Sequence, residues 1–106
     1  MSSFTTLDMT LLAEFFTFKQ KGGESFKNAW DRISELHQKI QPMLAMCVLL
    51  RCFYYGLSDA CKHALDFITG GYFLEIDELE SLRIINVWLF FPWMRKLMEY
   101  LIDWIK

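Results

Sequence analysis

Apolar residues recur at helical spacing between residues 24 and 40 and fall on one face. These residues are Phe26, Ala29, Trp30, Ile33 and Leu36. We therefore expect an amphipathic helix from Glu24 to Ile40, ending before Pro42 because the residue before a proline disfavours helical geometry. Gly22 and Gly23 permit a tight turn just ahead of this helix.

Similar spacing predicts further helices on both sides. The expected segments are 7–19, 43–55, 60–68, a helix after Asp77 that ends near Phe91, and 93–105. The first of these could start at Thr6 or Asp8, and its end, Phe16–Lys19, could instead be extended. The chain is therefore expected to be all-α.

Short local signals mark the expected helix ends. Gly56 is placed to end the segment 43–55 as a left-handed C-cap, and Ser58–Asp59 precedes the next helix, which Gly70–Gly71 would close. Asp77 with Glu80 three residues later resembles a capping box, with Asp in place of the usual Ser or Thr.

The segment 43–55 is apolar almost all round, with Arg51 as its one charge. If Met46, Leu49 and Phe53 face the preceding helix, four other residues point elsewhere. They are Leu44, Cys47, Arg51 and Tyr55. A short helix that is hydrophobic on every side needs partners on every side. We therefore predict that these four residues form a surface for self-association with a second copy of the chain.

Polar residues cluster where the first turn meets the helix 24–40. Glu24 lies two helical turns before Arg32, which Asp31 precedes, and Gln20 can fold back across them from the turn. We predict that Gln20, Glu24 and Arg32 form a structural hydrogen-bonded network, with ordinary solvated charge as the alternative.

The composition narrows the functional classes. Hydrophobic residues make up 54% and aromatic residues 17% of the chain, so much apolar surface needs covering. The net charge of −2 gives no electrostatic footprint for nucleic acid, so RNA binding is not expected of this segment. Three cysteines, an odd number, argue against a secreted disulfide framework, and the N-terminus lacks the pattern of a secretory signal. A cytoplasmic location is expected.

The longest apolar run, Ile84–Met94, is interrupted by Asn86 and Pro92. It falls well short of the roughly 20 residues that a membrane-spanning helix requires. The last helix should carry a polar stripe. Its residues are Lys96, Glu99, Asp103 and Lys106. Because these charges are mixed rather than basic, core or subunit contact is favoured over a membrane surface. A membrane-peripheral or scaffold adaptor built on this Trp-rich tail is the alternative.

The cysteines and histidines do not form a recognisable site. Cys47, Cys52, Cys61 and His63 lack the spacing of a zinc site. Cys61 and His63 point about 200° apart on a helix and cannot form a nucleophilic pair. His37 is expected to be solvated. We therefore predict no metal, no cofactor and no enzymatic activity.

Three blocks of the sequence resemble a known family. Gln20, Glu24, Phe26, Asp31 and Arg32 look like the major homology region of retroviral and retrotransposon capsid proteins. The blocks Glu24–Arg32, Leu49–Leu57 and Leu65–Phe73 resemble, in order, the gag segment of plant gypsy-type LTR retrotransposons. The resemblance covers roughly residues 11 to 85.

The resemblance implies a small helical domain similar to a capsid C-terminal lobe over residues 1–85, followed by an extra apolar helical tail over 86–106 of uncertain origin. It implies a structural role in which the chain associates with itself. In this family, dimers commonly use the helix after the homology region, which is here the segment 43–55.

Overall fold

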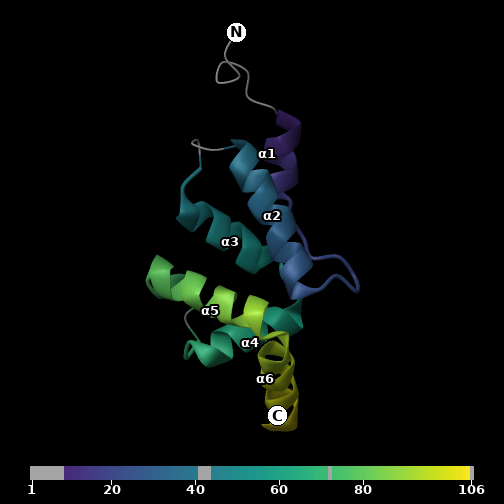
Figure 1. Cartoon of the computed structure of the whole chain (residues 1–106), viewed down its shortest axis with the longest axis vertical. Coiled ribbons are helices and arrows are strands. Elements are labelled where there is room, and N and C mark those ends of the chain that lie inside the picture. The colour runs from purple at the N-terminus through teal and green to yellow at the C-terminus, as the bar shows by residue number, and fades with distance from the viewer. Residues whose placement is uncertain (1–8, 41–43, 72, 106) are drawn as a thin grey trace. The chain divides into compact units, whose positions relative to one another are not determined.

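The computed structural model describes residues 9–40, 44–71 and 73–105 (Figure 1). Within these ranges the chain is all-α, as predicted, with no strand. The helices are α1 (Met9–Phe16), α2 (Phe26–Ile40), α3 (Met46–Gly56), α4 (Asp59–Ile68), α5 (Glu78–Phe90) and α6 (Pro92–Ile105), with a short 3-10 helix, η2 (Phe73–Glu75). The expected helix starts at Thr6, Asp8 and Met43 lie outside the described residues, as does Lys106.

Packing divides the chain into two compact units, a first unit of residues 1–56 and a second unit of residues 57–106. The boundary that the resemblance predicts, between residues 85 and 86, falls inside α5.

In the first unit, α1 and α2 run antiparallel side by side and α3 packs on α2 (Figure 1). The apolar face predicted for α2 is buried, except that Trp30 is half-buried. Its buried members include Phe26, Ala29, Ile33 and Leu36. From α3, Phe53 is fully buried among three aromatic rings, those of Phe18, Phe26 and Trp30, at centroid distances of 6.1, 5.3 and 5.0 Å. Phe53 is therefore the centre of this core.

Helix α2 begins at Phe26 rather than at the predicted Glu24. The Ser25 hydroxyl accepts a hydrogen bond from the Asn28 backbone N–H at 3.0 Å, which is the geometry of an N-cap. Glu24 lies outside the helix, in the turn. The segment Phe16–Lys19 could have been helical or extended. Helix α1 ends at Phe16 and the backbone from Phe18 to Lys21 is non-helical, so the helix does not continue to Lys19.

Gly56 is not the predicted left-handed cap. It is the last residue of α3, and the glycines with positive φ are Gly23, Gly70 and Gly71. Instead, Gly56 permits a close approach of the chain. A Cβ at this position would collide with the Phe18 carbonyl oxygen and ring, and the Gly56 carbonyl accepts a hydrogen bond from the Gln20 backbone N–H at 2.7 Å.

His37 is buried, with 4% of its surface exposed, so the expectation that it is solvated is wrong. It follows Ile33 by four residues and therefore continues the buried face of α2. Its Nε2 lies 2.9 Å from the Leu44 carbonyl oxygen. This contact joins the C-terminal turn of α2 to the segment that leads into α3.

In the second unit, α6 packs on α4 and α5. Ser58 caps α4 by accepting from the Cys61 N–H at 3.3 Å, and Gly70 and Gly71 have positive φ after it, as the sequence predicts. Asp77 caps α5, but its carboxylate accepts from Leu79 rather than closing a capping box with Glu80. Glu80 lies 3.0 Å from Arg83 instead. The largest buried side chains here include Leu65, Phe73, Ile85 and Trp88.

Candidate functional site

The structure joins the three residues predicted to form a polar network, which we call the polar node: Gln20, Glu24 and Arg32. Arg32 donates to both carboxylate oxygens of Glu24, from Nε at 3.0 Å and from Nη2 at 2.8 Å. The Gln20 side-chain amide donates to the Glu24 carbonyl oxygen at 2.8 Å. The arrangement is bidentate, which is the strongest geometry for a guanidinium–carboxylate pair.

The polar node also holds the turn itself. Arg32 Nη2 donates to the Lys19 carbonyl oxygen at 2.8 Å, and the Lys21 backbone N–H donates to Glu24 at 2.9 Å. The guanidinium carbon lies 4.5 Å from the centre of the Phe18 ring, within range of a cation–π interaction. Arg32 thus ties α2 to three positions of the turn.

Burial and pairing change the pKa values of Glu24 and Arg32. The side chain of Glu24 is 12% exposed and that of Arg32 is 32% exposed. The hydrogen bonds from Arg32 lower the pKa of Glu24 from 4.5 to about 2, although burial opposes this change. The same pairing raises the pKa of Arg32. Glu24 is therefore ionised at neutral pH and serves as a structural anchor.

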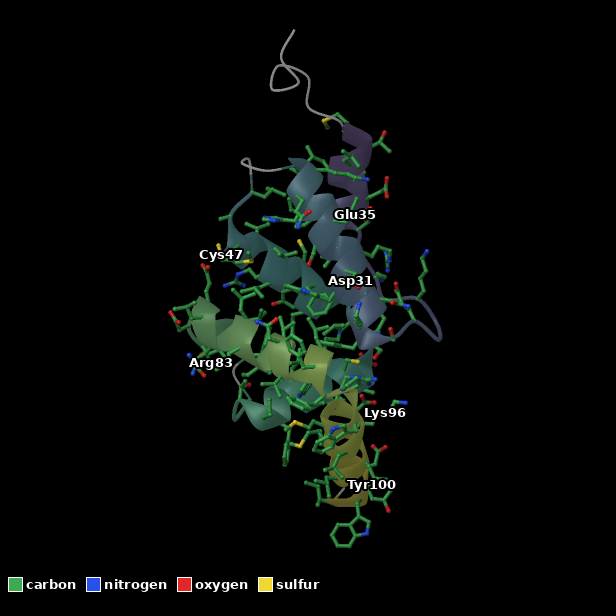
Figure 2. All side chains as sticks on the ribbon, viewed as in Figure 1. Asp31, Glu35, Cys47, Arg83, Lys96 and Tyr100 are labelled. Carbon is green, nitrogen blue, oxygen red and sulfur yellow. The ribbon has the colours of Figure 1, made fainter. Side chains whose placement is uncertain are left out.

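Three of the four residues predicted for self-association share a side of α3, which we call the α3 face: Cys47, Arg51 and Tyr55. All three are exposed and follow each other at intervals of four residues, while Leu49 and Phe53 are buried on the other side. Figure 2 shows Cys47 in the first turn of α3. Leu44 precedes the helix and is half-buried, so it is not part of this face.

A shallow groove of about 270 Å³ adjoins the α3 face. Arg51 and Tyr55 line it from α3, and Phe16 and Phe18 line it from the end of α1 and the turn. Phe16 and Tyr55 are both more than half exposed. The α3 face is therefore not a flat polar surface, because it borders a concave apolar patch.

Helix α6 carries an exposed apolar row that the sequence prediction missed, which we call the α6 seam: Trp93, Leu97, Tyr100 and Trp104. The side of α6 that is half-buried carries a charge pair instead, since Arg95 pairs with Glu99 and approaches the Cys61 sulfur of α4 at 3.8 Å. The predicted polar stripe is therefore not one solvent face, because Glu99 points inward. The 4-3-4 spacing of the α6 seam was the signal that could have revealed it.

Among residues 9–40, 44–71 and 73–105, no group of three or more His, Cys, Asp or Glu side chains is arranged to hold a metal ion. The three cysteines are free thiols: Cys47 is exposed, Cys52 is half-buried and Cys61 is buried. Burial raises the pKa of the Cys52 thiol. Cys61 is enclosed whereas His63 is exposed, so the two do not form a nucleophilic pair.

None of the described helices is long and apolar enough to cross a membrane. Comparisons of the chain with models of protein families, with curated proteins and with solved structures find no match.

Proposed function

We propose that this chain is a non-catalytic structural domain that associates with a second copy of itself. The observation that carries the proposal is the α3 face, whose three residues are exposed and two of which, Arg51 and Tyr55, line an apolar groove. Exposed apolar concavity of this kind is typical of surfaces that are covered by a partner.

The contacts beneath the α3 face support this role, because they hold the face rigid before a partner arrives. The Gln20–Gly56 backbone hydrogen bond fixes the end of α3 to the turn, and Arg32 fixes the turn to α2. A surface that is already ordered loses less conformational freedom on association. The polar node thus has an indirect role, as the support for one wall of the groove.

The finer part of the proposal is that the chain is similar to a capsid lobe encoded by a plant LTR retrotransposon gag gene. Its support is the three ordered sequence blocks, Glu24–Arg32, Leu49–Leu57 and Leu65–Phe73. The proposed partner is the chain itself, with no cofactor, no small-molecule substrate and no RNA site within this segment. The odd number of cysteines, three, is the support for proposing a reducing, cytoplasmic compartment.

The test is light scattering of the full chain at increasing concentration, up to several hundred micromolar. Cys47→Asp with Tyr55→Asp places two charges on the α3 face without touching the core, since both side chains are exposed. We expect the double variant to fold and to lose the association that this face provides. The matched control is Lys39→Asp on α2, also exposed. A variant that associates as the wild type does would contradict the proposal.

A second candidate function is favoured by the α6 seam, whose exposed Trp residues suit a membrane-peripheral or scaffold adaptor. Its charges count against a lipid surface, because Lys96 and Asp103 cancel each other. Co-sedimentation with vesicles is the direct measurement of this function, and it forms part of the experiment described next.

A further inference from the structure

The α6 seam leaves large side chains in solvent. Trp93, Leu97, Tyr100 and Trp104 have exposed fractions between 47% and 75%. No residue of α6 within its described range is fully buried. The helix packs on α4 and α5. The four residues of the α6 seam form one row along it, and Leu101 and Ile105 are exposed beside this row.

The spacing of the α6 seam is that of a short coiled coil. Positions 93, 97, 100 and 104 follow the 4-3-4 intervals of alternating d and a positions over two heptads. Met94 and Leu101 then occupy the e positions on one flank, and Lys96 and Asp103 occupy the g positions on the other. One flank is therefore apolar, and the other carries one charge of each sign.

The residues at the e and g positions favour one partner helix and one relative orientation of the two helices. We propose that α6 pairs with α6 of a second copy in antiparallel orientation. This pairing sets Trp93 opposite the Trp104 of the other copy, and Leu97 opposite its Tyr100. It also sets Lys96 of each copy beside Asp103 of the other, because g positions face g positions in an antiparallel pair. Two ion pairs between the copies, each of Lys96 with Asp103, therefore border the paired α6 seams.

Other occupants fit the same residues less well. In a parallel pair, g positions face e positions, so Lys96 would adjoin Leu101 and no ion pair would form between the two copies. A membrane surface is favoured by a basic polar face, and here the two flanking charges cancel. The remaining charges on α6, Arg95 and Glu99, pair with each other on its half-buried side.

The expected affinity is modest. Six aromatic side chains and two leucines from two copies would bury on the order of 1,000 Å² in total, at the lower end for specific interfaces. The helix is already formed and held by α4 and α5, so pairing does not require folding. We expect a dissociation constant on the order of 10 micromolar.

Pairing through α6 does not depend on the α3 face. If the chain associates through the α3 face as well as through α6, each copy has two separate self-complementary surfaces. This step rests on the proposed function. Two such surfaces on one chain generate open linear arrays rather than closed dimers. A chain with the α6 seam alone would stop at the dimer.

The experiment is sedimentation equilibrium of the full chain across a range from about 1 to about 300 micromolar, which brackets the expected constant. It is repeated with Leu97→Asp plus Tyr100→Asp, with the α3 variant described above, and with the two sets combined. We expect the Leu97→Asp plus Tyr100→Asp variant to raise the dissociation constant of pairing through α6 at least tenfold. This effect should appear whether or not the α3 variant changes association. An unchanged concentration dependence in the α6 variant overturns the inference, whereas an inert α3 variant overturns only the proposed function.

Charge exchange tests the antiparallel geometry. Lys96→Glu alone and Asp103→Lys alone each place like charges together and should weaken pairing about fivefold. The double exchange re-forms both ion pairs and should return the dissociation constant to within about twofold of the wild type. Lys39→Glu on α2 controls for the change in net charge. A double exchange no stronger than the single variants overturns the antiparallel arrangement.

The membrane alternative is measured on the same samples. Vesicles of phosphatidylcholine with phosphatidylserine are mixed with the wild-type chain and the Leu97→Asp plus Tyr100→Asp variant, and then sedimented. We expect neither protein to pellet with the vesicles. The inference is overturned in favour of a lipid partner if the wild-type chain pellets with the vesicles, the variant does not, and the wild type is monomeric in solution.

Discussion

Helices α2 and α6 are almost equal in length, yet they use their apolar residues in opposite ways. Six of the 15 residues of α2 are buried, whereas none of the 14 residues of α6 is. In α2 the aromatic and aliphatic residues point inward and the ion pairs Lys27–Asp31 and Glu35–Lys39 lie outside, where Figure 2 labels Asp31 and Glu35. In α6 the charge pair Arg95–Glu99 is half-buried and the α6 seam is outside.

This difference shows what helical periodicity can and cannot specify. The spacing of apolar residues establishes that a face exists. It does not establish whether the chain's own core or a partner covers that face. For α2 the core is supplied by α1 and α3, whereas for α6 the residues that pack on α4 include the paired Arg95 and Glu99. The predictions below test this contrast, from the largest expected effect to the smallest.

The first prediction compares Phe53→Ala with Trp104→Ala. Phe53 is fully buried among three rings, so its removal leaves a cavity and should reduce the free energy of unfolding by about 3–5 kcal/mol. Trp104 is 75% exposed, and its removal should cost less than about 0.5 kcal/mol. Denaturant unfolding of both variants at low micromolar concentration, followed by circular dichroism, measures the difference. Similar losses for the two variants would mean that Trp104 of α6 is packed as tightly as the core residue Phe53 of α3.

The second prediction concerns the polar node. Arg32→Ala leaves the Glu24 carboxylate without its bidentate partner and frees the Lys19 carbonyl, so it should cost about 2 kcal/mol of unfolding free energy. The larger loss of a fully buried pair is not expected, because a third of the Arg32 side chain is exposed. Lys27→Ala is the matched control: it breaks an exposed pair with Asp31 and should cost less than about 0.5 kcal/mol. A loss for Arg32→Ala below about 1 kcal/mol would remove the structural role of the polar node.

The sequence predicted the partners in the polar node but not their geometry. The spacing of eight residues suggested that Glu24 and Arg32 share a face of one helix. In the structure Glu24 lies in the turn before α2, and its carboxylate reaches Arg32 from outside the helix. The bond from Arg32 to Lys19 spans 13 residues and follows from how the turn folds back, which a local pattern does not contain.

Gly56 and His37 were also interpreted incorrectly. A glycine at the end of a helix suggested a left-handed cap, but the position is constrained by the close approach of Phe18. A histidine among polar neighbours suggested solvent, but its place four residues after Ile33 puts it on the buried face. The environment of Gly56 is set by a segment distant in the sequence, whereas the burial of His37 follows from a local spacing that the prediction did not use. The buried face of α2, by contrast, followed from spacing alone.

The third prediction is a pH dependence confined to the polar node. Because the pKa of Glu24 is lowered from 4.5 to about 2 in the folded chain, its ionised form stabilises the fold at pH values above 4.5. That contribution is lost as the pH falls from 4.5 to about 2, where folded Glu24 becomes protonated. The full shift corresponds to about 3 kcal/mol. Solvent screening at the partly exposed Arg32 should reduce the contribution to about 1–2 kcal/mol.

The measurement compares the unfolding free energy of the wild type and Glu24→Gln at several pH values between neutral and acid. Glutamine keeps the size of the side chain but has no ionisable group, so the difference between the two proteins should shrink as the pH falls through this window. Asp31→Asn is the matched control, because Asp31 makes only an exposed pair with Lys27 and should contribute little at any pH. If the wild type and Glu24→Gln lose stability in parallel on acidification, the carboxylate of Glu24 is not an anchor of the turn.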